Sequence, residues 1–344
     1  MSRPPMLVLG IETSCDETAA AVVADGLAVR SNVIASQTDL HARFGGVVPE
    51  IASRLHVERI TAVVEAALEQ AGCTLADLDG VAVTNRPGLI GSLLVGVCAA
   101  KGIAFGRGLP LVGVHHLEGH VFASFVAAGE VVVPSVALIA SGGHTELFYV
   151  RDAHDYAIMG RRLDDAAGEA FDKGARALGL GAGGGAALDR LARAGDPHAV
   201  SFPRARTDHP LDFSFSGLKT ALLRFLENDG GRTPREDVAA SYQQAIVDVL
   251  IERSLHAAAI AGVRTLLVGG GVAANSRLQE QMRAAASERD LRVEFPPREL
   301  CTDNAAMIAA AGHSLLARGV RHDFDLETRA REPLTTRRFP ADGA

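Results

Sequence analysis

The chain has no tryptophan among its 344 residues, and aromatic residues make up only 5% of it. A surface of stacked aromatic rings, which many proteins use to bind single-stranded nucleic acid, is therefore not expected. Basic residues are also scarce, since 34 Lys and Arg face 41 Asp and Glu and leave a net charge of −7. This balance excludes a polybasic nucleic-acid coat but is compatible with a local basic groove.

Cysteines are few and scattered, which excludes two classes of small stabilised domain. The four are Cys15, Cys73, Cys98 and Cys301. No two form a CxxC pair, so free thiols in a reducing compartment are expected rather than disulfides or a zinc knuckle. Polar Glu12 arrives too early for a signal-peptide core, and no apolar run approaches the roughly 18 residues of a membrane span. We expect a cytoplasmic protein.

The order of apolar runs predicts an α/β protein with two related halves. A strand, a polar turn and a second strand are expected over 7–23 and again over 135–150. A strand followed by a glycine turn and a helix recurs at 81–96 and 266–278. This duplication is typical of the actin, Hsp70 and sugar-kinase (ASKHA) fold, which holds nucleotides in a cleft between two lobes.

The length exceeds what one hydrophobic core usually holds, so two domains are expected. We place an N-terminal lobe at 1–134 and a C-terminal lobe at 135–318, with the last helix able to pack back on the first lobe. Residues 319–344 contain several Arg and Pro and are predicted to be a weakly structured extension.

Two histidines form the sharpest local signal. His116 and His120 are four residues apart, so on a helix both imidazoles face one side and can share a metal ion. The order of residues differs from the zincin HExxH motif, because Glu118 stands one position too late to face a metal-bound water. A metallopeptidase is therefore disfavoured.

An aspartate precedes the alanine-rich run near the end of the chain. Asp303 can be read as the N-cap of a helix, the commonest role at such a place. It can also be read as a third ligand that completes a His₂Asp set with open positions. From the residues alone, the cap is favoured.

Glycine-rich turns point to anion binding. Ser141, Gly142 and Gly143 form a strand-to-strand turn whose amides can cradle a phosphate, and Asn275 closes a glycine turn that opens a helix. Neither a P-loop nor a GxGxxG fingerprint is present. The stretch 163–181 is predicted to be helical, with Asp172 standing out beside an apolar anchor and a glycine-rich loop.

Taken together, eight motifs resemble the TsaD family, formerly called Gcp, over about residues 7–316. They are IETSCDET, GGVVPEIASR, HHLEGH, ASGGHT, DDAAGEAFDK, FSFSGLKT, GGGVAAN and CTDNAAMIA. The resemblance implies an ASKHA fold and a metal-dependent acyltransferase. Such enzymes move the threonylcarbamoyl group of threonylcarbamoyl-AMP to N6 of adenosine 37 in tRNAs that read ANN codons.

The resemblance also implies roles for single residues. Its metal ligands fall on His116, His120 and Asp303, with Fe(II) expected first and Zn(II) as the alternative. Its substrate contacts fall on Ile139, Ala140, Ser141, Gly142, Gly143, Asp172, Gly185, Asp189 and Asn275. No general base is identifiable; Glu12 is a guess, and a structural acceptor role for it is an equal alternative.

Partners are implied in the same way. The family works with a TsaB-like paralogue and a TsaE-like ATPase, while a TsaC-type enzyme makes the intermediate. Because the net charge is negative, tRNA binding should rest on local basic residues or on partner subunits. The basic candidates are Arg161, Arg162, Lys173, Arg176, Arg204, Arg206, Lys219 and the arginines of the tail. A non-catalytic nucleotide-binding scaffold is the remaining alternative.

Overall fold

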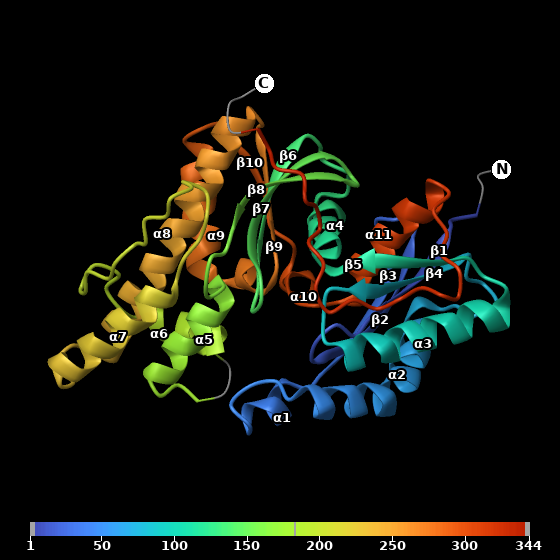
Figure 1. The fold of residues 1–344 in the computed structure, drawn as a ribbon, viewed down its shortest axis with the longest axis horizontal. Helices are drawn as coiled ribbons and strands as arrows, with labels where there is room; N and C mark the ends of the chain where they lie inside the picture. Colours follow the sequence, from blue (N-terminus) through green and yellow to red (C-terminus); the bar gives the residue numbers. More distant parts are fainter. Residues whose placement is uncertain (1–3, 182–183, 341–344) are drawn as a thin grey trace. The chain divides into compact units, whose positions relative to one another are not determined.

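The computed structural model describes residues 4–181 and 184–340 (Figure 1). Contacts divide the chain into two compact units, and each is described by itself. The first unit combines residues 1–131 with 303–334, and the second combines 132–302 with 335–344. The domain limits expected from the sequence stay a prediction about independently folding parts, which limited proteolysis can test.

The first unit is built on a five-stranded mixed sheet with the order β3-β2-β1-β4-β5. Its strands are β1 (Leu7–Glu12), β2 (Glu17–Ala24), β3 (Ala28–Ser36), β4 (Gly80–Arg86) and β5 (Leu111–His115). The first three form an antiparallel meander, whereas β1, β4 and β5 run parallel. The three parallel strands therefore bring their carboxyl ends to one edge of the sheet.

Helices cover this sheet on both faces. They are α1 (Thr38–Ala42), α2 (Pro49–Ala71), α3 (Ile90–Arg107), α4 (His116–Ala128) and α11 (Ala305–Ala317). The last helix crosses β1 so closely that a Cβ on Gly10 would lie 2.3 Å from the carbonyl oxygen of Ala305. A chain segment from the far end of the sequence thus becomes part of the first unit's core.

Within the described part of the chain, one helix meets the length and composition of a membrane span, contrary to our expectation from the sequence. It is α3, and 33% of its apolar window is buried inside the protein. It packs on β4 and α2, while Ile90, Leu94 and Phe105 stay exposed. Core helices of globular proteins pass the same test, so this single helix is weak evidence for a membrane.

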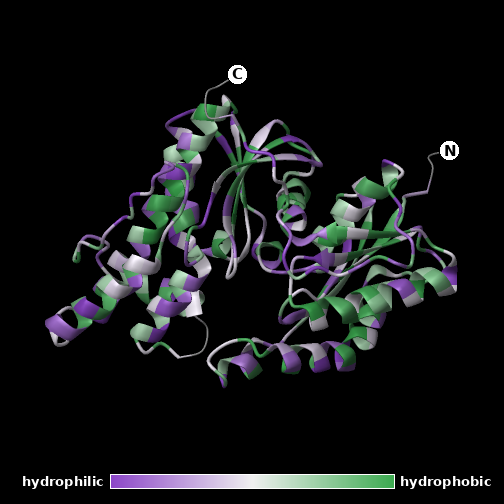
Figure 2. Cartoon of the chain, viewed as in Figure 1, coloured by the Kyte–Doolittle hydropathy of each residue, from purple (hydrophilic) through white to green (hydrophobic). Residues whose placement is uncertain are grey.

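The second unit repeats the sheet of the first. Its order is β10-β9-β6-β7-β8, with β6 (Ser135–Ala140), β7 (Thr145–Asp152), β8 (Asp155–Arg161), β9 (Thr265–Gly269) and β10 (Arg292–Glu294). Again a three-stranded antiparallel meander continues into parallel strands. The duplication predicted from the sequence is confirmed, and Figure 2 shows hydrophobic residues over most of both sheets.

The helices of the second unit follow three of its strands. They are α5 (Ala167–Ala177), α6 (Gly184–Ala192), α7 (Ser216–Asp229), α8 (Arg235–Ala261), the 3₁₀ turn η1 (Gly271–Ala274), α9 (Ser276–Ser287) and α10 (Arg298–Cys301). The helix predicted over 163–181 is shorter than expected. Asp164 precedes it and instead accepts hydrogen bonds from Ser214, Phe215 and Ser216.

The tail has no named helix or strand over residues 319–340, but several contacts hold it. In the first unit the Arg329 amide donates to the Asn85 carbonyl, and Arg86 pairs with Glu332 at 2.9 Å. In the second unit the Phe339 amide donates to the Ile158 carbonyl of β8. The tail has no helical or strand periodicity because each of its short pieces is held by a different part of the fold.

Candidate functional site

The histidine pair lies where strand β5 passes into helix α4. The strand ends at His115, whose Nδ1 accepts the amide of Leu117 and so caps the helix. Its Nε2 contacts the Glu332 carbonyl of the tail at 3.0 Å. His116 and His120 then fall one turn apart on α4, as their spacing predicted.

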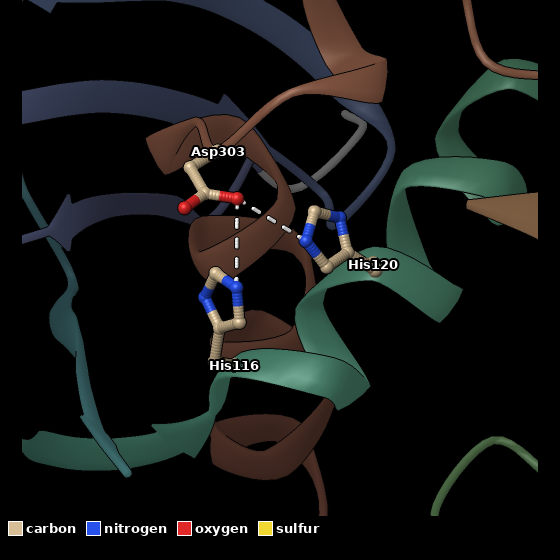
Figure 3. Close-up of side chains that lie close together, drawn as sticks. All are labelled: His116, His120 and Asp303. Atoms are coloured by element: carbon tan, nitrogen blue, oxygen red, sulfur yellow. Dashed lines mark ion pairs between the residues drawn. The ribbon is translucent and has the colours of Figure 1, made fainter. Parts of the chain in front are cut away.

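Asp303 faces both histidines (Figure 3). Its Oδ1 lies 3.5 Å from the Nε2 of His116 and 3.3 Å from the Nε2 of His120. One ligand atom from each residue can be chosen so that all three lie within 4.8 Å of one another. The three side chains that the sequence singled out are therefore brought together within the first unit.

The helix-cap role for Asp303 is excluded. The N-cap of α11 is the next residue, Asn304, whose side chain accepts the amide of Met307 at 3.0 Å. Asn304 is fully buried, whereas the Asp303 carboxylate is partly exposed and turned toward the histidines. The cap and the acidic group are thus supplied by two neighbouring residues.

The surroundings of the three residues suit a divalent cation. His120 is fully buried, yet neither of its ring nitrogens makes a well-aligned hydrogen bond, an arrangement that a metal ligand role explains. Two imidazoles and a carboxylate match the donors used for Zn(II) and non-haem Fe(II). The donor set and the unsatisfied His120 both fit a metal.

Burial and neighbouring carboxylates shift the pKa values of the groups around the histidines. Burial together with the charges of Asp303 and Asp16 raises the pKa of Glu17 to about 9. Burial disfavours a charged His116, but Asp303 and Glu12 outweigh it and raise the pKa of that imidazole to about 9. Burial lowers the pKa of His120. Near neutral pH His120 is therefore neutral and available as a ligand, whereas His116 would have to lose a proton when a metal binds.

The second unit contains a pocket of about 350 Å³. It is lined by five residues that the sequence reading proposed for substrate: Gly142, Asp172, Gly185, Asp189 and Asn275. This volume lies at the lower end of the range for small-ligand pockets. Five of the nine proposed residues thus share one cavity, and the other four lie in or next to the turn after β6.

That turn offers fewer amides than expected. Ile139 and Ala140 are buried in β6, and the Ser141 amide already donates to the His144 carbonyl at 2.8 Å. Gly142 and Gly143 are exposed, and a Cβ on either would meet nothing within 4 Å. Gly142 and Gly143 therefore leave open space in which an anion can approach the turn.

The polar side chains of the pocket are partly engaged with one another. Asp172 accepts the Gly185 amide at 2.9 Å, and Asp189 accepts the Ser276 hydroxyl at 2.8 Å. Asn275 caps α9 through the Leu278 amide and donates to Gln243. The Oδ1 of Asn275 therefore stabilises the helix start, a role that the sequence reading did not assign to it.

Sequence reasoning missed several residues at both places. Arg190, Arg193 and Arg298 line the pocket, and Arg193 pairs with Asp189 one turn before it on α6. The i,i+4 spacing of Asp189 and Arg193 could have predicted this ion pair from the sequence. Thr84 donates to Glu12 at 2.6 Å beside the histidines, but nothing in its local sequence marks it.

Some basic residues proposed for tRNA are already paired within the second unit. Lys173 contacts Asp165 and Glu169, and Arg204 contacts Asp248. Arg337 of the tail pairs with Asp155. Pairing reduces the net positive charge that these side chains present to a polyanion.

Comparison with known proteins decides between the enzyme classes left open. The sequence model of the TsaD family, described as tRNA N6-adenosine threonylcarbamoyltransferase, matches residues 28–310. The chain belongs to the TsaD family. A relative of that name from Symbiobacterium thermophilum is 56% identical over 322 residues, which cover 93% of this chain and 94% of the relative. One from Geobacillus kaustophilus is 54% identical over 333 residues, covering 95% and 96%.

Solved structures agree on the fold. HypF of T. kodakarensis superposes with a TM-score of 0.63 at 14% identity, covering 92% of this chain and 49% of HypF. Component A of the Acidaminococcus fermentans (R)-2-hydroxyglutaryl-CoA dehydratase gives 0.54 at 16% identity, covering 91% and 99%. At such low identity these likenesses establish the architecture alone, and they confirm the expected ASKHA fold.

Proposed function

We propose that this chain transfers the threonylcarbamoyl group of threonylcarbamoyl-AMP to N6 of adenosine 37 in tRNAs that read ANN codons. The observation that carries the proposal is the match to the TsaD family over residues 28–310, with relatives of that activity aligned over nearly the whole chain. The cluster of His116, His120 and Asp303 supports it, because a buried donor set suits a catalytic ion.

The reaction needs an activated donor and a well-placed acceptor. The lone pair of adenine N6 is delocalised into the ring, so N6 attacks only a strongly electrophilic carbonyl. A mixed anhydride with AMP supplies one. A bond forms from N6 to the carbamoyl carbon, the bond from that carbon to the phosphate oxygen breaks, AMP leaves, and N6 loses one proton. Holding both reactants in place supplies much of the rate.

The first unit would hold the metal. His116, His120 and Asp303 provide two nitrogens and a carboxylate oxygen, and we propose Fe(II) as the ion, with Zn(II) as the alternative. The ion supplies Lewis-acid polarisation and a fixed charge when bound.

The second unit would hold the nucleotide part of the donor. The open turn at Gly142 and Gly143 leaves room for the AMP phosphate, and Asp172 and Asp189 offer carboxylates to ribose hydroxyls. Arg193 and Arg298 line the same pocket and would compensate phosphate charge. Direct transfer is expected, since the chemistry requires no covalent enzyme intermediate.

Partners and location follow from the reaction. A TsaB-like paralogue and a TsaE-like ATPase would assist this chain, and a TsaC-type enzyme would supply the donor. We propose that the reaction takes place in the cytoplasm, where this tRNA is used. Lys173 and Arg204, which pair with carboxylates, would contribute less to tRNA binding than their charges alone suggest.

The experiment is nucleoside analysis of tRNA from cells depleted of this protein. The threonylcarbamoyl nucleoside should disappear and return with the wild-type gene, but not with Asp303→Asn. A matched control is His256→Ala, an exposed histidine of α8, which should restore it. Unchanged modification after depletion would overturn the proposed function and favour a nucleotide-binding scaffold.

A further inference from the structure

The two histidines of the cluster are held in different ways. The Nδ1 of His116 lies 3.1 Å from the Glu12 Oε2 and 3.3 Å from the Ser14 hydroxyl. Its other nitrogen, Nε2, faces Asp303. Among residues 4–181 and 184–340, His120 has a neighbouring carboxylate at Nε2, and none of them forms a hydrogen bond with its buried Nδ1. The ring of His116 is thus oriented through its Nδ1, whereas the ring of His120 is not.

Glu12 is in turn fixed by its own neighbours. Its Oε2 accepts the Thr84 hydroxyl at 2.6 Å, and its Oε1 accepts the Ser14 amide. Glu12 and Thr84 are both fully buried. Glu12 ends β1, Thr84 lies near the end of the adjacent β4, and His116 follows β5. The carboxyl ends of three neighbouring parallel strands therefore build one hydrogen-bonded chain from Thr84 through Glu12 to His116.

We propose that Glu12 and Thr84 are positioning residues that fix the tautomer and rotation of His116, with the Nδ1 proton toward Glu12 and the Nε2 lone pair toward the metal. This inference rests on the proposed metal site. Carboxylates behind ligand histidines orient the ring and strengthen it as a donor. Thr84 acts one step further away, because its hydroxyl holds the Glu12 oxygen that faces His116.

The arrangement also argues against Glu12 as a general base. Both of its oxygens already accept hydrogen bonds, and the side chain has no exposed surface. A base must reach the proton that it removes, directly or through one water. Glu12 reaches His116 instead, which makes an indirect role through the ligand the better account.

The test is the affinity of metal-free protein for Zn(II), measured by competition with a chromophoric chelator. Glu12→Ala should weaken binding by about 10- to 100-fold, the usual effect of losing an outer-shell partner. Thr84→Val should weaken it less, by a few-fold, and should add nothing in the Glu12→Ala background because both act through one chain. Glu12→Gln should restore part of the loss, since its carbonyl oxygen can still accept from Nδ1.

Thr18→Val is the matched control for Thr84→Val. Thr18 is equally buried on the same sheet, but its hydroxyl contacts His56 at 2.7 Å rather than Glu12. Its Zn(II) affinity should equal that of the wild type. Equal weakening by both valine variants, or additive losses in the Glu12→Ala, Thr84→Val double variant, would show a general packing effect and overturn the proposal.

A spectroscopic measurement covers the case in which the variants fold poorly. In the Zn(II)-loaded wild type, ¹⁵N NMR of the histidine side chains should show His116 protonated at Nδ1 and metal-bound at Nε2. Metal at Nδ1 would contradict the inference. His120→Ala separates the two hypotheses: if it keeps full Zn(II) affinity, the metal site itself is wrong. If it loses Zn(II) while Glu12→Ala does not, only the positioning role fails.

Discussion

The histidine cluster of the first unit and the pocket of the second differ in what they are made of. The cluster uses three side chains, two of them buried on one helix, and the Glu12 carboxylate lies beside one of the histidines. The pocket uses glycine turns, helix starts and arginines around about 350 Å³ of space. The proposed cation site thus depends on a few side-chain atoms, whereas the proposed nucleotide site depends mainly on the shape of the backbone around the pocket.

The largest expected effect is the loss of a buried ligand. His120→Ala removes one of three donors from a fully buried position. Metal content should fall from one ion per chain to near zero, and transfer should fall by more than the roughly 100-fold that an outer partner costs. Elemental analysis and a transfer assay measure the two effects. His256→Ala is the control and should keep its metal. Full metal content in His120→Ala would contradict the assignment of His120 as a ligand.

A second prediction concerns the backbone of the turn after β9, beside the pocket of the second unit. Gly270 has φ +88°, and a Cβ there would lie 2.3 Å from the Ala140 carbonyl oxygen. Gly270→Ala should therefore destabilise the second unit by about 2 kcal/mol or more. Gly271→Ala is the control, since its Cβ would meet nothing within 4 Å. Thermal unfolding measures both, and equal midpoints would contradict the close approach of β6 and the β9 turn.

The tail tests how far the histidine cluster depends on distant segments. Ending the chain at residue 328 removes the bonds of Arg329 to Asn85 and of Glu332 to Arg86 and His115. We expect a loss of about 1 to 3 kcal/mol in the free energy of unfolding, given the usual value of such bonds. Ending it at residue 340 removes none of these contacts and serves as the control. Identical denaturant midpoints for the two truncations would show that the tail does not stabilise the fold.

A smaller effect concerns pH. Burial lowers the pKa of His56, which contacts Thr18 and the Cys15 carbonyl in the first unit. The unfolded chain then takes up its proton at a higher pH, near the ordinary value of about 6.5, so stability should fall as pH drops below that value. The slope from this group is at most about 1.4 kcal/mol per pH unit. Denaturant titrations between pH 7 and 5 should show a shallower decline in His56→Gln, and an unchanged slope would contradict it.

The repeated sheet was predictable because alternating strands and glycine turns recur in both halves of the sequence. The pair His116 and His120 was predictable because a helix brings residues four apart to one face. The residues around Asp303 favoured a capping role, and only the family resemblance indicated a ligand there. Only the folded chain shows that Asn304 takes the cap and leaves Asp303 toward the histidines.

Other parts of the molecule depend on contacts that no local pattern records. Thr84 reaches Glu12 because β4 pairs with β1, although the two residues are 72 positions apart. The tail is held by backbone hydrogen bonds to β4 and β8, which carry no side-chain signature. Arg298 joins the pocket through the short helix α10, far along the chain from Asp172.

The most direct test of the account compares Asp303→Asn with Asp172→Asn by two binding measurements, Zn(II) competition and AMP calorimetry. We predict that Asp303→Asn loses Zn(II) binding and keeps its AMP affinity within about twofold. Asp172→Asn should keep Zn(II) binding and lose at least about tenfold in AMP affinity, which is the effect expected from losing a hydrogen bond to a charged group. Zn(II) retained by Asp303→Asn, or AMP bound equally by wild type and Asp172→Asn, would contradict the assignment of the cation to the first unit and the nucleotide to the second.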